Sequence, residues 1–337
     1  MAYLPPAYFL PLKSYLGLDF LFAGFPQLVA GPIVRYTTVA EEIDERHESV
    51  SEFSAGAVRF LFGLGKKMLL ANAVARIADA AFAAAMPSVL FAWLGAVAYT
   101  FQIYFDFSAY SDMAIGLGRM FGFHFLENFN YPYVARSVTE FWRRWHISLS
   151  TWFRDYVYIP LGGNRCSRAR NVWNLFVVWF LTGMWHGASW NFIAWGLWFF
   201  VLLVGEKFLW GKALERLPSL VRHAYAMVLV VFSWVLFRAE TLTAAAAYLA
   251  AMFGSSGVWC GSRVVYYALE FWPELLCCCI AALPVKQWLE TALQKRDAAP
   301  ARAVLTWGPK LAAMTLLACS YCKLVTGSFN PFIYFRF

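Results

Sequence analysis

The chain has 337 residues, of which 61% are apolar and only 14% are charged. Soluble domains average about 45–50% apolar and about 25% charged residues, so the composition excludes a soluble globular domain. The net charge of +8 comes from basic residues in short loops between apolar runs. That distribution is typical of membrane topology and not of a nucleic-acid-binding module, and we expect no nucleic-acid partner.

Apolar runs recur along the whole chain, for example at 88–101, 172–185 and 192–204. A transmembrane helix needs about 20 apolar residues, and only helices or closed barrels satisfy the backbone inside a bilayer. These runs are too long and too continuous for barrel strands. The sequence therefore predicts an all-α, polytopic transmembrane helical bundle, multi-pass in the cell (inner) membrane.

The first predicted elements are irregular. Residues 15–34 are apolar but carry Gly24, Pro26, Gly31 and Pro32, which predicts a broken or re-entrant segment. Residues 53–86 form a helical stretch interrupted by Lys66 and Lys67, two lysines expected at a membrane interface.

A long helix is predicted over 88–122, and it carries Asp106 and Asp112. Carboxylates inside a span are costly, and a spacing of six places these two on different faces of the helix. This spacing disfavours a catalytic carboxylate pair and favours structural hydrogen bonds inside the bundle.

The next predicted helix covers 136–157, and Ser137 with Glu140 forms a capping box at its start. Its charges predict that it lies at an interface or enters a polar cavity obliquely. Further spans are predicted at 171–189, 191–210, 221–239, 266–284 and 304–325, with a shorter apolar piece at 242–253.

The connections between the predicted spans differ in charge. The loops 162–170, 207–222 and 286–302 are basic, whereas the alternate connections are uncharged or balanced. The positive-inside rule places the basic loops in the cytoplasm, so the C-terminus is expected outside. The seven cysteines show no metal-ligand spacing with histidine, and we expect neither a structural metal nor a disulfide framework.

Two of the five histidines, His146 and His186, lie in Trp-rich sequence between 131 and 190. Thr182, Gly183 and Ser189 share a small polar helix face with His186, which indicates a cavity lining. Ionisable residues at membrane depth are candidates for function. The alternatives are a histidine hydrogen-bonded across helices for packing, and an interfacial histidine among aromatics.

A neutral, buried histidine is suited to general-base chemistry. Such a base deprotonates a hydroxyl from one side of the membrane, which then attacks an activated acyl group from the other side. Neither histidine has a carboxylate one turn away, so a partner such as Asp106 or Asp112 would come from elsewhere. The basic loops suit a donor that carries phosphates.

Several long motifs resemble the bacterial, alginate O-acetyltransferase-like branch of the membrane-bound O-acyltransferase (MBOAT) superfamily. The resemblance covers residues 24–337, and its motifs are PQLVAGPIVRY (26–36), FDFSAYSDMAIG (105–116), NFNYPY (128–133), FWRRWHISLSTWFRDYVYIPLGG (141–163), TGMWHGASWNFIAWG (182–196), FSWVLFRAET (232–241) and NPFIYFRF (330–337).

The resemblance implies an MBOAT fold in which interfacial and re-entrant helices surround a central tunnel. It implies acyl transfer, with His186 of the WHG motif as the catalytic histidine and His146 as a second active-site residue. Arg165 is a weaker candidate for contacting donor phosphates, and the candidate substrate-binding residues are Arg143, Arg144, Trp142, Asp106, Trp185 and Asn130.

No bound cofactor or metal is expected, and the acyl donor is acetyl-CoA or another acyl thioester. The implied partners are the lipid bilayer, a polysaccharide acceptor such as alginate, and exported O-acetyltransferase proteins on the outer side. Alternatives are D-alanyl or peptidoglycan O-acyl transfer, a carrier without chemistry, and a non-catalytic truncated remnant. Family members have further spans before PQLVAGPIVRY, so residues 1–337 are expected to form a single membrane-embedded domain that is incomplete at its N-terminus.

Overall fold

The computed structural model describes residues 32–34, 42–43, 45–295, 299–326 and 332, and every regular element within them is helical. This confirms the predicted all-α fold. The predicted irregular segment at 15–34 lies outside the described residues except for 32–34, and so does 330–337 except for Phe332.

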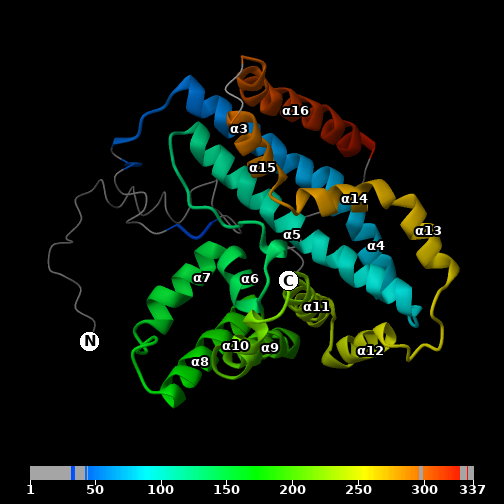
Figure 1. Ribbon diagram of the computed structural model, residues 1–337. Coiled ribbons are helices and arrows are strands. Elements are labelled where there is room, and N and C mark those ends of the chain that lie inside the picture. The colour runs from blue at the N-terminus through cyan, green and yellow to red at the C-terminus, as the bar shows by residue number, and fades with distance from the viewer. Residues whose placement is uncertain (1–31, 35–41, 44, 296–298, 327–331, 333–337) are drawn as a thin grey trace.

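The long helix α5 (Val89–Met120) runs through the centre of the bundle (Figure 1). Helices α3 (Val50–Gly65), α4 (Asn72–Phe82) and α16 (Ala299–Thr326) lie on one side of it, and α6 to α11, which fall within residues 138–238, lie on the other. Most of α5 is buried inside the protein, because its apolar side chains are distributed around the whole helix instead of along one stripe.

Within the described part of the chain, four helices are long and apolar enough to cross a membrane. They are α5, the continuous helical stretch Trp190–Glu215 (α9, η4 and α10), α11 (Ser219–Arg238) and α16. The predicted span at 266–284 is not one continuous helix. It consists of α13 (Ser262–Glu270) and α14 (Trp272–Ala281), bent by 64°. Pro273 explains the break, since proline starts a helix well but lacks the N–H needed to continue one.

Three shorter helices complete the described structure. The short α10 (Gly211–Glu215) follows the π-helical turn η4 (Glu206–Trp210) and precedes α11, whereas α12 (Leu242–Met252), which matches the predicted short apolar piece, and α15 (Val285–Gln294) come after α11. Helix α8 (Arg168–His186) precedes α9 (Trp190–Gly205) and packs along it.

The prediction that Lys66 and Lys67 lie at an interface is wrong for Lys67, which is only 5% exposed. The helix is not interrupted there but widens into the π-helical turn η1 (Lys66–Ala71) between α3 and α4. Lys67 pairs with Asp106 of α5, and Lys66 Nζ lies 2.6 Å from Asp112 Oδ2. The two carboxylates therefore hold α5 against η1, which is the structural role predicted for them.

The predicted continuous helix at 136–157 is also wrong. It consists of α6 (Val138–Arg144), α7 (Ile147–Phe153) and the π-helical turn η3 (Arg154–Tyr158). Ser137 does cap α6, because its Oγ accepts a hydrogen bond from Glu140 N–H. The break falls at His146, whose backbone is left-handed with φ 45° and ψ 56°.

Helix α6 is also held at its start by a buried carboxylate from another part of the chain. Glu206 of η4 accepts hydrogen bonds from the backbone N–H groups of Val138 and Thr139, at 2.7 and 2.8 Å. The first N–H groups of a helix have no partner inside it, so Glu206 satisfies two of them and ties α6 to the end of α9.

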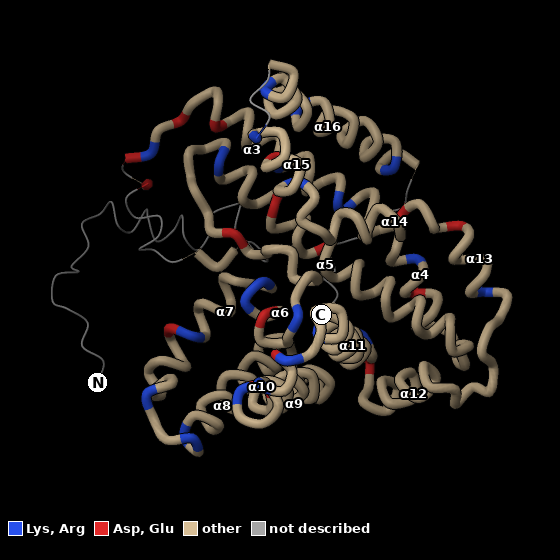
Figure 2. The backbone as a smooth tube through the Cα atoms, viewed as in Figure 1, with Lys and Arg blue, Asp and Glu red and all other residues tan. Residues whose placement is uncertain are grey.

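Two of the three basic loops lie together at one end of the bundle. Lys207 Nζ donates to Asn171 Oδ1 at 2.7 Å, which joins η4 to the start of α8. Figure 2 shows lysine and arginine segments, in blue, at this end of α8. The contact supports a common side for the two loops, and their cytoplasmic placement stays a prediction.

Candidate active site

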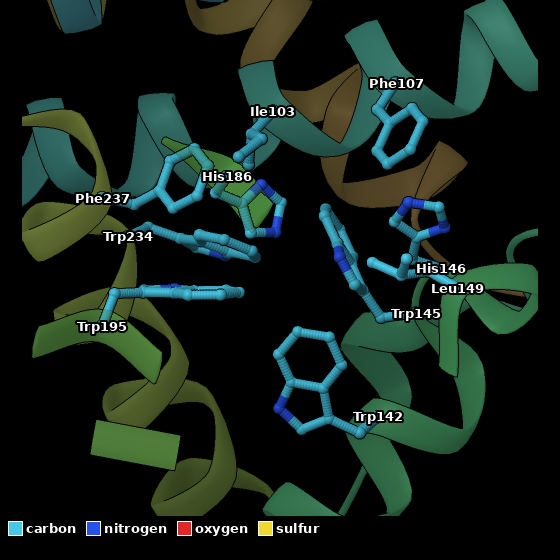
Figure 3. Close-up of a pocket in the computed structure, with 10 residues that line it drawn as sticks. All are labelled: Ile103, Phe107, Trp142, Trp145, His146, Leu149, His186, Trp195, Trp234 and Phe237. Carbon is cyan, nitrogen blue, oxygen red and sulfur yellow. The ribbon is translucent and has the colours of Figure 1, made fainter. Parts of the chain in front are cut away.

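A narrow cavity of about 20 Å³ lies between α5, α6, α7, α8, α9 and α11. It has room for about one water molecule. Ten side chains line it (Figure 3), and eight of them are aromatic or imidazole rings. They are Ile103, Phe107, Trp142, Trp145, His146, Leu149, His186, Trp195, Trp234 and Phe237.

His186 is the last residue of α8, at the point where the chain turns into α9. Gly187 follows with φ 152°, and a Cβ there would lie 2.8 Å from the Phe192 ring, so the turn needs glycine. The imidazole packs edge-on against Trp195 and Phe237, with ring centroids 4.9 and 5.2 Å apart. The WHG motif thus ends the helix and holds its histidine against aromatic rings of α9 and α11.

Helices α8 and α9 approach each other closely beside this turn. A Cβ on Gly196 would lie 2.4 Å from the carbonyl oxygen of Trp179, and one on Gly183 would lie 2.6 Å from that of Phe192. Small residues at such positions let helix backbones come together in a membrane. The small face predicted to line a cavity packs against α9 instead, which fixes the position of His186, and of that face only His186 lines the cavity.

His146 is placed by the break between α6 and α7, and it is 3% exposed. Its ring meets Phe107 of α5 edge-on, with centroids 4.7 Å apart. Burial, with a smaller contribution from the neighbouring His186, lowers the pKa of His146 to about 3. The imidazole is therefore neutral at physiological pH.

The two histidines come from separate elements and line the same cavity. In Figure 3 the indole of Trp145 lies between the two imidazoles. Trp185 contacts both, with centroid distances of 6.2 Å to His146 and 4.9 Å to His186. The family resemblance implied that both histidines belong to one active site, and the structure brings them together at one cavity.

The other candidate residues are dispersed. Trp142 lines the cavity, whereas Arg143 is exposed and Arg144 pairs with Glu140 at 2.9 Å. Asp106 is paired with Lys67 and is not in the lining.

Arg165 lies exposed in the loop before α8, and its backbone N–H donates to the carbonyl oxygen of Gly162. No carboxylate lines the cavity, so a histidine–carboxylate pair does not form among its walls. The described residues also contain no group of three or more histidine, cysteine and acidic side chains able to hold a metal ion.

Sequence reasoning missed Asn128 and named Asn130 in the same NFNYPY motif. Asn130 has an exposed side chain, and its backbone N–H donates to the carbonyl oxygen of Arg144 at 2.9 Å. Asn128 is fully buried, and its Oδ1 lies 3.0 Å from His146 Nδ1. A contact over 18 residues has no local signal in the sequence, so only the fold identifies Asn128.

The geometry defines a multi-pass membrane protein with two histidines, of which His146 is buried, at one small aromatic cavity. Residues 10–246 match the MBOAT, membrane-bound O-acyltransferase family. The chain belongs to this family of O-acyltransferases, as its motifs indicate.

The chain is similar to named proteins of the family. It is 42% identical to the "probable alginate O-acetylase AlgI" of Azotobacter vinelandii, over 93% of this chain and 68% of that protein. Identity is 37% to a peptidoglycan O-acetyltransferase of Helicobacter pylori, over 75% of this chain and 50% of the relative. The chain is also 28% identical to a teichoic acid D-alanyltransferase of Bacillus subtilis, over 68% of this chain and 60% of that protein.

Proposed function

We propose that this chain moves acetyl groups from a cytoplasmic thioester donor, such as acetyl-CoA, across the inner membrane for O-acetylation of an extracytoplasmic polysaccharide such as alginate. The observation that carries the proposal is the convergence of His146 and His186 on one buried cavity in a member of an O-acyltransferase family. The relatives named for alginate supply the acceptor class.

The chemistry uses the two imidazoles in different roles. His186 takes the proton from an acceptor hydroxyl as its oxygen attacks the thioester carbonyl, and the C–S bond breaks as the ester C–O bond forms. The imidazolium then returns the proton to the departing thiolate, so that the enzyme is regenerated. His146 either orients the acceptor or polarises the thioester carbonyl.

The surroundings of the cavity support chemistry on an activated acyl group. The space of about 20 Å³ is walled mostly by tryptophan and phenylalanine. The low polarity of the walls excludes bulk water, which protects the thioester from hydrolysis. Exported O-acetyltransferase partners on the outer side would deliver the polysaccharide acceptor to this site.

The histidine at the end of α8 provides the direct test. His186→Ala should abolish polymer O-acetylation in cells that lack their own copy of the gene, with unchanged protein level in the membrane. His47→Ala is the matched control, because His47 is exposed and lies outside the cavity lining. Ester-linked groups on isolated polysaccharide are identified by mass, which separates acetyl from D-alanyl.

Retained acetylation in the His186→Ala strain would remove the catalytic role and favour a carrier without chemistry. Recovery of D-alanyl esters in place of acetyl esters would replace the proposed substrate while leaving acyl transfer intact. Loss of acetylation in both the His186→Ala and the His47→Ala strains would point to a general defect of the protein.

A further inference from the structure

Asn128 connects His146 to two other segments of the chain. Its Oδ1 accepts hydrogen bonds from Ser148 N–H at 3.2 Å and from Ser148 Oγ–H at 2.9 Å, and it lies 3.0 Å from His146 Nδ1. The backbone carbonyl of Asn128 also accepts from Ile147 N–H at 2.9 Å. Ser148 Oγ in turn accepts from the backbone N–H of Ile33, at 3.1 Å.

These contacts determine which atom of the Asn128 amide faces His146. A backbone N–H can only donate, so the atom that meets Ser148 N–H is the amide oxygen and not the NH₂ group. The same oxygen lies against His146 Nδ1. That nitrogen must therefore carry the proton and donate it to Asn128, which leaves Nε2 as the unprotonated nitrogen of the neutral ring.

The Nε2 nitrogen of His146 is buried and has no hydrogen-bond partner among the described residues. An unpaired buried acceptor costs free energy, and in a cavity wall it is available to a polar substrate group. The titratable group that faces His146 from a neighbouring element is His186. Asp106 and Asp112 on α5 are paired with basic residues of α3 and η1.

We infer that Asn128 is a positioning residue that holds His146 with its Nε2 lone pair toward the cavity, so that His146 accepts a hydrogen bond from an acceptor hydroxyl. The inference rests on the proposed acyl transfer, and it selects one of the two roles left open for His146. Polarising a carbonyl requires a donor at Nε2, and a neutral ring held in this tautomer has none. A sugar acceptor offers neighbouring hydroxyls, so one can meet His146 while another loses its proton to His186.

Asn128→Asp separates the two roles. The carboxylate still accepts from Nδ1–H and from Ser148, so the tautomer and the geometry are kept. The added negative charge favours the imidazolium, which raises the pKa of His146 by about 1–3 units. If His146 acts as an acceptor, its protonation removes the lone pair. The acid limb of the pH–rate profile should then move upward by at least about 1 pH unit.

The measurement uses membranes from expressing cells, with radiolabelled acetyl-CoA and an alginate oligosaccharide, across pH 3 to 9, so that the range includes the wild-type pKa of His146 at about 3. Gln287→Glu makes the same change from amide to acid on the exposed face of α15 and should leave the profile unchanged. Asn128→Ala, which releases the tautomer, should lower the rate by about 10–100-fold. The level and melting temperature of each variant are measured in parallel.

The outcomes are distinct from those that test the proposed function. An unshifted profile in Asn128→Asp, or higher activity on the acid side, would overturn the inference, since the second result means that His146 works as a donor. Full activity in Asn128→Ala would also overturn the inference. If instead His186→Ala remains active in the same membranes, or wild-type membranes transfer no acetyl group, the proposed function itself fails.

Discussion

The buried ion pair between Lys67 and Asp106 allows a direct test of what stabilises the contact between η1 and α5. The two side chains are 6% and 4% exposed, so removal of either charge leaves the other in a medium of low polarity. Breaking such a pair from one side costs about 3–5 kcal/mol, whereas removal of both charges is often neutral. Lys67→Met and Asp106→Asn should each destabilise the protein by that amount, and the double variant should be more stable than either single variant.

The assay is thermal unfolding of the detergent-solubilised protein, followed by loss of the monodisperse peak. Each single variant should lower the melting temperature by at least about 5 °C, and the double variant should recover most of that loss. Glu290→Gln is the control, because Glu290 and Lys286 are 41% and 72% exposed and 3.8 Å apart. An exposed pair contributes about 0–1 kcal/mol, so this variant should melt close to the wild type.

Two results would refute this reasoning. An unchanged melting temperature in Asp106→Asn would mean that water or another group compensates Lys67. A double variant that loses as much as the two single variants together would mean that the charges do not interact. Acetylation measured below the melting temperature adds a separate answer, because full activity in the double variant would exclude Asp106 as a substrate ligand.

Gly196→Ala should push α8 and α9 apart and abolish acetylation. The new methyl group would lie 2.4 Å from the carbonyl oxygen of Trp179, and overpacking of this kind costs about 1–3 kcal/mol. Gly308→Ala on α16 is its control, since the nearest atom there is 3.7 Å away, and equal damage by both variants would contradict the packing argument. Glu206→Gln should weaken the cap on the two backbone amides that begin α6 by about 1 kcal/mol and reduce acetylation, which is measured with a melting curve of the same sample. An unchanged rate and melting curve would show that this cap does not position the site.

Local patterns in the sequence predicted the parts of the fold that local physics determines. The apolar run at 88–122 corresponds to α5, and the Ser137 cap marks the start of α6 within two residues. The small polar face around His186 predicted a cavity lining, and His186 itself does line the cavity. These features depend on residues within two or three turns of one another.

Long-range contacts account for the parts that could not be predicted. A lysine inside a helix is expected at an interface unless a carboxylate elsewhere compensates it, and for Lys67 that carboxylate lies 39 residues away. The break at His146 depends on a hydrogen bond from Ile147 N–H to the carbonyl oxygen of Asn128. Nothing in the local sequence disfavours continuation of the helix there, so the turn follows only from the assembled bundle.

The left-handed backbone at His146 restricts the replacements that this position can accept during evolution. Left-handed geometry costs roughly 1–2 kcal/mol for most residues, and glycine, asparagine and aspartate adopt it most readily. Most substitutions would therefore lose the imidazole without relieving the strain, and glycine would relieve the strain while removing the chemistry. Both the backbone conformation and the reaction therefore restrict natural variation at position 146. A variant selected for stability alone would lose activity.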